Sequence, residues 1–451
     1  MNDPNGLVFA GGVYHLFFQH HPDSNVWGPM HWGHATSRDL LHWDEQPIAL
    51  FPDALGMIFS GSIVIDWENT SGLGRDGKAP WVAIFTHHNQ LAEKTGGNVH
   101  QYQSIAFSLD DGNSWTKYAG NPVLPNPGIK NFRDPKVFWH TETRRWVMCL
   151  AAGSRVSFYA SPDLKNWALE SDLGGFEIAD GNVLECPDLV ALDLEGRKRW
   201  VLIVSVVTDA PNGGSGTRYI VGDFDGHRFV PEHQDIRWLD YGPDNYAGVT
   251  FHNTGEQVLL LGWMSNWAYA QAVPTAPWRS AMTLPRELSL ALVDGKAMLS
   301  QRVPSVFDGQ ISLDGDWFSD LSTAWCQARG VLCLSLKVEN QLPFQLTLGT
   351  EIGDRLTIGF DAAEQHYYID RRHAGQSSFS PEFPIRATAP RIVASHGTDI
   401  SLYFDNGSVE LFADNGITTM TSLFFPRADY TSAILQTSAE AMNGRLTLAR
   451  L

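Results

Sequence analysis

Residues 133–167 read RDPKVFWHTETRRWVMCLAAGSRVSFYASPDLKNW, and this stretch decides the fold. It contains three short apolar runs, Lys136–His140, Trp146–Ala152 and Val156–Ala160, with polar turns between them. Runs rich in Val, Phe, Tyr and Trp, bounded by Gly, Asn, Asp and Pro, are typical of β-strands. The closing segment, residues 161–167, predicts a turn into an outer fourth strand.

The same kind of turn closes two earlier segments. It reads SRDLLHW at residues 37–43 and SLDDGNSW at residues 108–115. In each copy we expect the Asp to bond the turn backbone and the Trp to bury its ring against the sheet. The recurrence predicts a series of four-stranded sheets.

Five openings, 51 to 74 residues apart, each precede an apolar strand in the first 300 residues. They are Asn2-Asp3-Pro4-Asn5-Gly6, Phe59-Ser60-Gly61-Ser62, Arg133-Asp134-Pro135, Glu185-Cys186-Pro187 and Tyr246-Ala247-Gly248. Four strands in about 60 residues match a propeller blade, so the pattern predicts a five-bladed β-propeller. We then expect the openings to meet at one end of a central channel. There Asp3, Asp134 and Glu185 would share a pocket from equivalent positions in their blades.

After about residue 300 the turn motif disappears and the strands alternate apolar with polar residues. Asn406-Gly407 and Asn415-Gly416 are hairpin turns of the kind that join such strands. The sequence therefore predicts an all-β chain with a propeller at residues 1–298 and a β-sandwich at residues 306–451. The sandwich would serve either as structural support or as a sugar-binding module.

The bulk composition narrows the classes of partner. The 451 residues are 43% hydrophobic, enough for large cores, and carry a formal charge of −18. That charge argues against nucleic acid and anionic membranes as partners. No apolar run is long enough to span a bilayer. The His residues lack ligand spacing with a third partner, so we expect neither a metal nor a cofactor.

Paired carboxyl groups point to hydrolysis of a glycosidic bond, which needs an acid and a nucleophile or base on either side of it. Asp3 and Glu185 are the candidates, each at a strand start. Arg133 adjoins Asp134 and favours its ionised form. Glu185 has no adjacent cation in the sequence, so we expect it to be the protonated acid.

These motifs carry a resemblance to a known family. The openings, together with YHLFFQ at residues 14–19, MHWGH at 30–34 and WRSAMTLPR at 278–286, resemble glycoside hydrolase family 32. This is the family of invertases, inulinases and levanases. The match runs through the whole expected propeller in order. The expected sandwich resembles the family's second domain only in type and position.

The resemblance implies a retaining mechanism on β-fructosides such as inulin, levan, fructo-oligosaccharides or sucrose. Asp3 then matches the nucleophile, Glu185 the acid/base and Asp134 the stabiliser of the transition state. Retention would place the Asp3 and Glu185 carboxyls roughly 5–5.5 Å apart. The positions that match the fructose pocket of exo-acting members are Asn2, Gln19, Trp27, Phe59, Ser60, Arg133, Trp263 and, more weakly, Tyr246.

Three alternatives stay open at this point. The same residues suit a fructosyltransferase, and the same fold suits a fructan-binding propeller without catalysis. A sialidase-like enzyme is a further rival because residues 108–115 resemble its Asp-box turn, although the openings supply a lone Arg133. Preference among inulin, levan and sucrose, exo or endo action and oligomeric state also stay open. We expect a leader segment ahead of the first motif and an extracellular or periplasmic location.

Overall fold

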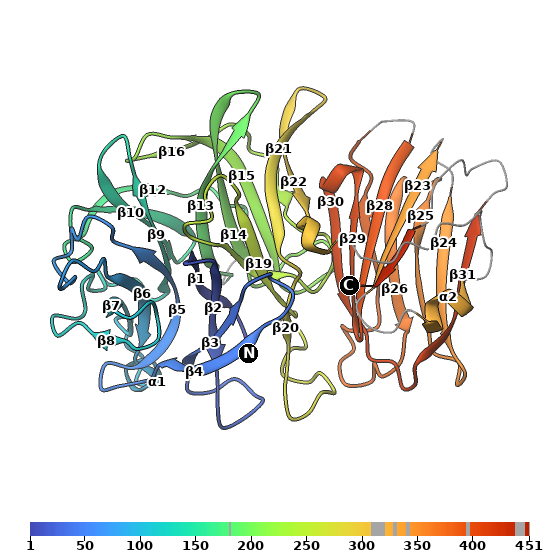
Figure 1. Ribbon diagram of the computed structural model, residues 1–451, viewed down its shortest axis with the longest axis horizontal. Coiled ribbons are helices and arrows are strands. Elements are labelled where there is room, and N and C mark those ends of the chain that lie inside the picture. Colours follow the sequence, from blue (N-terminus) through green and yellow to red (C-terminus); the bar gives the residue numbers. More distant parts are fainter. Residues whose placement is uncertain are drawn as a thin grey trace.

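The computed structural model describes residues 1–179, 182–307, 321–327, 332–339, 343–393, 397–437 and 447–450. Within these ranges the chain is almost entirely antiparallel β-structure (Figure 1), which confirms the expected all-β class. The described helical segments are short: α1 (Gln90–Lys94), α2 (Ser322–Gln327) and the 3₁₀ turns η1 (Ser305–Phe307) and η2 (Asp414–Gly416).

The first three sheets follow one another along the chain, each with its strands in sequence order. The first contains β1 (Pro4–Ala10), β2 (Val13–His20), β3 (His31–Ser37) and β4 (Asp44–Leu50). The second contains β5 (Met57–Ile65), β6 (Trp81–His88), β7 (Gln101–Ser108) and β8 (Thr116–Lys117). The third contains β9 (Phe132–His140), β10 (Arg145–Ala152), β11 (Arg155–Ser161) and β12 (Ala168–Leu173).

The fourth and fifth sheets add a short extra strand to the same plan. The fourth contains β13 (Leu184–Leu194), β14 (Arg197–Val206), β15 (Gly216–Phe224) and β16 (Phe229–Pro231), with β17 (Arg237–Trp238) also on β15. The fifth contains β18 (Tyr246–Thr250), β19 (Leu259–Met264), β21 (Arg286–Val293) and β22 (Lys296–Arg302), with β20 (Ala281–Met282) on β19.

The first strands of these five sheets form a closed series. Each contacts the first strand of the next sheet, and β18 returns to β1. The closure is a pair of backbone hydrogen bonds, Phe9 N to His252 O at 3.0 Å and His252 N to Leu7 O at 2.8 Å. Behind the first strands, an apolar cluster fills the space between every two neighbouring sheets. Side chains at the start of all five first strands therefore face a common centre.

The Asp turns have the geometry expected from the sequence. The carboxylate of Asp39 accepts the backbone N–H groups of Leu41 and His42. The carboxylate of Asp163 makes the equivalent bonds in the turn between β11 and β12. Trp43 donates its indole N–H to the carbonyl of Leu40 at 2.9 Å. The turn prediction is confirmed, and its cause is local side-chain to backbone bonding.

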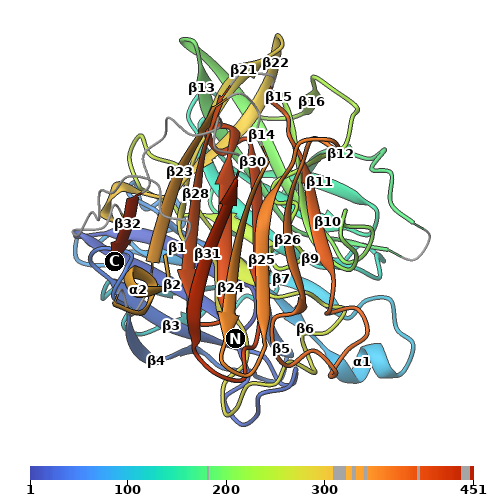
Figure 2. The ribbon, with the colours of Figure 1, turned by 90° about the vertical axis from the view of Figure 1, so that its right-hand side faces the viewer.

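Two further five-stranded sheets form the C-terminal part (Figures 1 and 2). One has the order β30 (Thr418–Leu423), β29 (Ser408–Ala413), β28 (Gly397–Asp405), β23 (Leu332–Glu339), β32 (Thr447–Arg450). The other has the order β27 (Arg386–Pro390), β26 (His366–His373), β25 (Arg355–Asp361), β24 (Phe344–Thr350), β31 (Tyr430–Thr437). They share one apolar core that takes residues from both sheets. Both Asn-Gly turns join neighbouring strands as expected, the second through η2.

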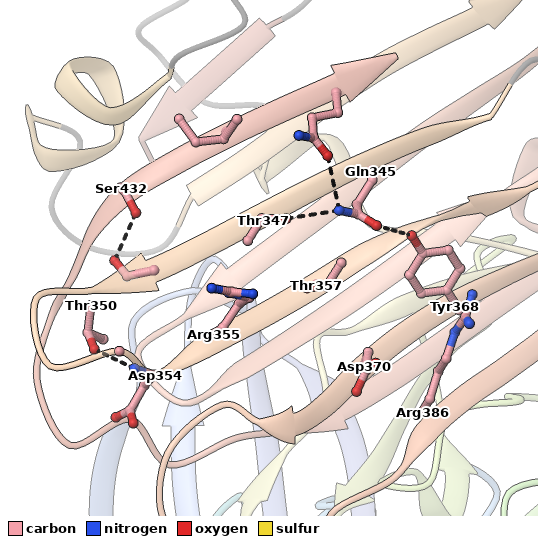
Figure 3. A pocket seen from close by; sticks show the side chains of 14 residues that line it. Gln345, Thr347, Thr350, Asp354, Arg355, Thr357, Tyr368, Asp370, Arg386 and Ser432 are labelled. Carbon is pink, nitrogen blue, oxygen red and sulfur yellow. Dashed lines mark hydrogen bonds between the residues drawn. The ribbon is translucent and has the colours of Figure 1, made fainter. Parts of the chain in front are cut away.

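The outer face of the second C-terminal sheet is polar and hollowed (Figure 3). The hollow measures about 730 Å³. Its side chains bond one another: Tyr368 donates to Gln345 at 3.0 Å, and Gln345 donates to Gln436 at 3.2 Å. The guanidinium of Arg386 lies 4.0 Å from the ring centre of Tyr368.

Buried ion pairs join the two parts of the molecule. Arg286 of β21 pairs with Glu410 of β29 at 2.7 Å and with Asp240 at 2.9 Å. Arg371 of β26 pairs with Asp244 at 2.5 Å. Since breaking a buried pair leaves an uncompensated charge, these contacts resist separation of the two parts.

Candidate active site

Each of the five first strands contains a β-bulge near its start, where two residues lie opposite one residue of the second strand. The last paired residues before the bulge are Asn5, Ile58, Arg133, Glu185 and Tyr246. A bulge bends its strand and redirects the side chains beside it. Asp134 and Cys186 occupy it with φ values of 64° and 45°, a left-handed conformation that is uncommon for residues other than glycine. The repeated openings of the sequence are therefore five copies of one backbone irregularity.

The carboxylates do not occupy equivalent positions, which corrects the sequence expectation. Glu185 is the last paired residue before its bulge, Asp134 lies one residue after that position, and Asp3 lies two residues before it. Aligning the openings by acidic residues misjudged the register because a bulge shifts side-chain direction by one residue. The three side chains nevertheless line one pocket of about 60 Å³.

One carboxylate oxygen of Asp3 accepts a hydrogen bond, and the other has no partner among the described residues. Ser60 donates to Oδ2 at 2.7 Å, and the thiol of Cys186 lies 3.6 Å from the same oxygen. Oδ1 is buried and has no hydrogen-bond partner among the described residues. Burial, and then the charge of Glu185, raises the pKa of Asp3 to about 6. Asp3 therefore presents an unpartnered oxygen in the pocket.

Asp134 is held by the backbone around it. Its own N–H donates to Thr86 at 3.0 Å, and its Oδ2 accepts the N–H of Cys186 at 3.0 Å. Burial raises the pKa of Asp134 to about 7, with Glu185 and Asp3 adding to the effect and Arg133, 3.8 Å away, opposing it. This carboxyl is fixed in direction and costly to ionise.

Glu185 is bonded from two sides. Arg133 donates to Oε1 through Nη2 at 2.6 Å and through Nε at 3.2 Å, and the hydroxyl of Tyr246 donates to Oε2. Its side chain is 17% exposed, against 6% for Asp134. Burial alone would lower the pKa of Arg133, but Glu185 and Asp134 hold it above its ordinary value. Burial, followed by Glu185, raises the pKa of Tyr246.

The pairing of Arg133 contradicts the sequence argument about Glu185. Chain adjacency suggested that Arg133 serves Asp134 and that Glu185 has no cation. In the structure the guanidinium contacts Glu185 at 2.6 Å and approaches Asp134 no closer than 3.8 Å. Successive residues of a strand point to opposite faces, so Arg133 turns away from its own neighbour. Burial raises the pKa values of both Asp3 and Asp134.

Cys186 was missed as a member of the site. Its sulfur lies 3.6 Å from Oδ2 of Asp3 and 3.8 Å from Oδ2 of Asp134, so one thiol separates two carboxylates. Burial, followed by Asp134 and Asp3, raises the pKa of this thiol well above its usual value. The neutral S–H is a weak donor to either oxygen. The sequence motif predicted the adjacent Glu185 as a site residue, but it did not predict the contacts of the Cys186 thiol.

The pocket walls contain most of the predicted binding residues. Asn2, Gln19, Trp27, Phe59, Ser60 and Arg133 all line it. Phe59 stacks on His88 with ring centres 4.3 Å apart, and Trp27 meets Phe59 edge to face. Trp27 is 38% exposed and stands at the rim.

Two predicted binding residues lie behind the wall. Tyr246 is fully buried and reaches the site only through its bond to Glu185. Trp263 is 1% exposed and packs 4.9 Å from Trp267, which lines the pocket in its place. Met30 also lines the pocket and was not predicted. It opens the MHWGH motif at residues 30–34, which was the signal that could have pointed to it.

The described residues contain no group of three or more His, Cys, Asp or Glu placed to hold a metal ion. Among the same residues, no helix has the length and apolar character needed to cross a membrane.

Family models match both parts of the chain. Residues 1–302 match the N-terminal domain model of the glycosyl hydrolases family 32, and residues 320–449 match the C-terminal model of that family.

Curated relatives agree with this match. A levanase of Bacillus subtilis is 42% identical over 458 residues, which cover 94% of this chain and 64% of the levanase. The chain thus spans less than two thirds of that relative. An extracellular exo-inulinase of Aspergillus awamori is 38% identical over 478 residues, covering 96% of this chain and 89% of the inulinase.

Solved structures share the architecture. The crystal structure of an exo-inulinase from Aspergillus awamori superposes with a TM-score of 0.88 at 35% identity and covers 100% of this chain and 96% of its own. The β-fructofuranosidase of Schwanniomyces occidentalis complexed with fructosyl-erythritol gives a TM-score of 0.87 at 32% identity, with coverage of 99% and 94%.

Proposed function

The chain belongs to the glycosyl hydrolases family 32, and on that premise we propose that it releases terminal fructose from β-fructosides with retention of configuration. Inulin-type and levan-type fructans, their oligosaccharides and sucrose are the proposed substrates. The names of the levanase and exo-inulinase relatives support this substrate class. No cofactor is part of the proposal.

Asp3 is the proposed nucleophile. The observation that carries the proposal is its buried, unpartnered Oδ1 inside a pocket shared with two other carboxyls. A nucleophile needs a free lone pair, while Ser60 holds the second oxygen and fixes the direction of attack. Oδ1 attacks the anomeric carbon, and the bond from that carbon to the leaving oxygen breaks.

Glu185 is the proposed acid and base. It is more exposed than Asp134, as suits a group that meets the leaving oxygen and then water. It first gives its proton to the leaving oxygen and later removes one from the water that attacks the fructosyl-enzyme. The guanidinium of Arg133 contacts Glu185 and, at a longer distance, Asp134, and burial raises the pKa values of Asp3 and Asp134.

Asp134 is the proposed stabiliser of the sugar in the transition state. Its bonds from the Cys186 N–H and to Thr86 through its own N–H hold it in one direction. Arg133, Asn2, Gln19 and the aromatic rim of Trp27, Phe59 and Trp267 complete a pocket suited to one furanose ring. A pocket of about 60 Å³ favours removal of single terminal units.

The architecture supports two domains, a five-bladed β-propeller and a β-sandwich, as the ranges 1–298 and 306–451 anticipate. The closed series of five first strands supports the propeller, and the shared core of the two C-terminal sheets supports the sandwich. β22 carries the fifth sheet to Arg302. The extracellular naming of the exo-inulinase relative favours an extracellular location.

Product analysis tests the function. Inulin, levan and sucrose would each be incubated with the enzyme, the products separated by chromatography and the first-formed anomer followed by proton NMR. We expect fructose alone from both polymers, with its anomeric configuration retained. A ladder of oligosaccharides would exclude exo action, inversion would exclude Asp3 as nucleophile, and transfer products from sucrose would assign a fructosyltransferase.

The Glu185→Gln variant tests the acid. We expect the basic limb of the pH–rate profile to disappear with a large loss of kcat, since glutamine donates no proton. Asp370→Asn, on the outer face of the C-terminal sheet, is the matched control. An unchanged basic limb in Glu185→Gln would remove Glu185 from the role.

A further inference from the structure

A second hollow opens at the pocket end of the fourth sheet and has no assigned role. It measures about 740 Å³ and is lined by residues of four segments that meet there. These are residues 177–179 ahead of β13, the loop between β14 and β15, the start of β15, and the segment around β17. The lining residues used below are Glu177, Asp209, Arg218, Ile236, Trp238 and Tyr241.

Strand register connects this hollow to the active site. Glu185 faces Ser205 on β14, Ser205 faces Thr217 on β15, and Leu239 donates to the carbonyl of Thr217 at 2.8 Å. Arg218 and Trp238 are paired one residue farther along the same strands. With strands about 4.8 Å apart, two to three strand spacings place the hollow roughly 10–15 Å from Glu185.

Arg218 gives the hollow a donor without a partner. The residue is 5% exposed, its Nη1 donates to the carbonyl of Glu177 at 2.8 Å, and its guanidinium lies 4.8 Å from the ring centre of Trp238. Nε of Arg218 is buried with no hydrogen-bond partner among the described residues. Nη1 is its one donor with a partner among the described residues, and Arg218 lines the hollow, so Nη2 can donate to a ligand there.

The remaining walls suit a sugar chain. Trp238 and Tyr241 are half-buried aromatic residues, and Ile236 is 43% exposed. Asp209 holds the loops together by accepting the side chain of Asn182 at 3.1 Å. An apolar surface with a few converging polar groups is the usual composition of a ligand site, and aromatic faces pack against the C–H faces of sugar rings.

We propose that this hollow binds fructosyl units of the polymer a few residues beyond the scissile bond and so makes the enzyme favour long fructans over sucrose. Trp238 provides the stacking surface and Arg218 the hydroxyl donor. The inference rests on the proposed function and names a distant subsite of the same site. The C-terminal hollow of Figure 3 is not chosen, because its polar side chains already bond one another.

The test compares polymer with sucrose in one set of preparations. Trp238→Ala removes the stacking surface, and Ile236→Asp alters an exposed position where folding is not at risk. We expect kcat/KM on long inulin to fall about tenfold in each, while kcat/KM on sucrose changes less than about twofold. Trp67→Ala, 66% exposed beyond the far end of β5, is the control and should change neither value.

A binding measurement separates failure of this inference from failure of the function. Inulin binding to Asp3→Asn is compared with binding to the double variant Asp3→Asn/Trp238→Ala by affinity electrophoresis, and we expect weaker retardation of the double variant. The inference would be wrong if kcat/KM fell equally on inulin and on sucrose. It would also be wrong if neither kcat/KM on inulin nor the retardation by inulin changed. An enzyme that releases no fructose from either substrate would overturn the proposed function instead.

Discussion

The active-site pocket and the C-terminal hollow of Figure 3 differ both in size and in chemistry. The pocket is about 60 Å³ and the hollow about 730 Å³. Three carboxyls line the pocket. The guanidinium of Arg133 lies 2.6 Å from Glu185 and 3.8 Å from Asp134, and Oδ1 of Asp3 has no hydrogen-bond partner among the described residues. In the hollow, Gln345, Tyr368 and Gln436 satisfy one another, and Asp354 is paired with Arg427.

The contrast indicates that buried polar groups without partners, rather than a large volume, mark a reactive site in this fold. Burial raises the pKa values of Asp3 and Asp134 to about 6 and 7, so their ionisation costs folding stability. The Arg427 bond lowers the pKa of Asp354, so its ionisation favours the folded state. In the proposed active site, ionisation of the carboxyls lowers folding stability. The C-terminal sheet face behaves as an ordinary solvated surface.

The largest expected effect is in Asp3→Asn. Losing the nucleophile should lower kcat on sucrose and inulin by about 10⁴-fold or more, while the melting temperature above pH 7 should rise rather than fall, because ionising the buried Asp3 costs folding stability. Asp370→Asn in the hollow is the matched control and should retain full activity. If Asp3→Asn kept more than a few per cent of the activity, the contrast between the two regions would lose its chemical basis.

Tyr246→Phe should come next. Its hydroxyl donates to Glu185 from a fully buried position, and a hydrogen bond to a charged group contributes about 1.5–3 kcal/mol. We expect kcat to fall about 10- to 100-fold, with KM for sucrose changing far less, because Tyr246 does not line the pocket. An equal rise in KM would instead mean that the residue holds the sugar.

The acidic limb of kcat/KM should reflect Asp3. Since the ionised carboxylate attacks, activity should fall about tenfold per pH unit below pH 6, where Asp3 takes up a proton. Part of the raised pKa comes from the charge of Glu185, so the residual activity of Glu185→Gln should show this limb at lower pH. A rate that stays flat from pH 7 to pH 5 would contradict the assignment.

Asp134→Asn should stabilise the fold. The pKa of Asp134 is raised from 3.8 to about 7, so the stability it contributes at low pH is lost as pH rises towards and through 7. At pH 8 the variant should melt about 2 °C or more above the wild type, and the difference should vanish near pH 4. Asp354→Asn should shift the melting temperature downward at pH 8, since its pKa is lowered. Calorimetric scans at both pH values give the comparison.

The smallest effect is expected at Arg386→Ala. Removing this side chain opens the hollow over Tyr368 but touches no group of the active site. We expect kcat/KM on inulin and on sucrose to change less than about twofold in steady-state assays. A selective loss on inulin would assign sugar binding to the C-terminal face and narrow the contrast between the regions.

Much of the fold could be predicted because its determinants are local. The Asp turns at Asp39 and Asp163 and the short apolar runs each depend on a few adjacent residues, so the sequence predicted sheets, strand order and openings correctly. Asp3, Asp134 and Glu185 were found because each belongs to a repeated opening. The family resemblance rested on the same motifs.

Contacts between sheets could not be predicted in the same way. Arg133 contacts Glu185 more closely than Asp134, and the sulfur of Cys186 lies near two carboxylates. Trp267 lines the pocket while Trp263 lies behind it. All three findings depend on side-chain direction. A bulge changes that direction by one residue, and closure of the ring from β18 to β1 decides which side chains meet. The sequence identified Asp3, Asp134 and Glu185 and most of the residues that line the pocket, because these belong to short motifs. The tertiary structure alone decided their partners and protonation, because these depend on distances between strands far apart in the chain.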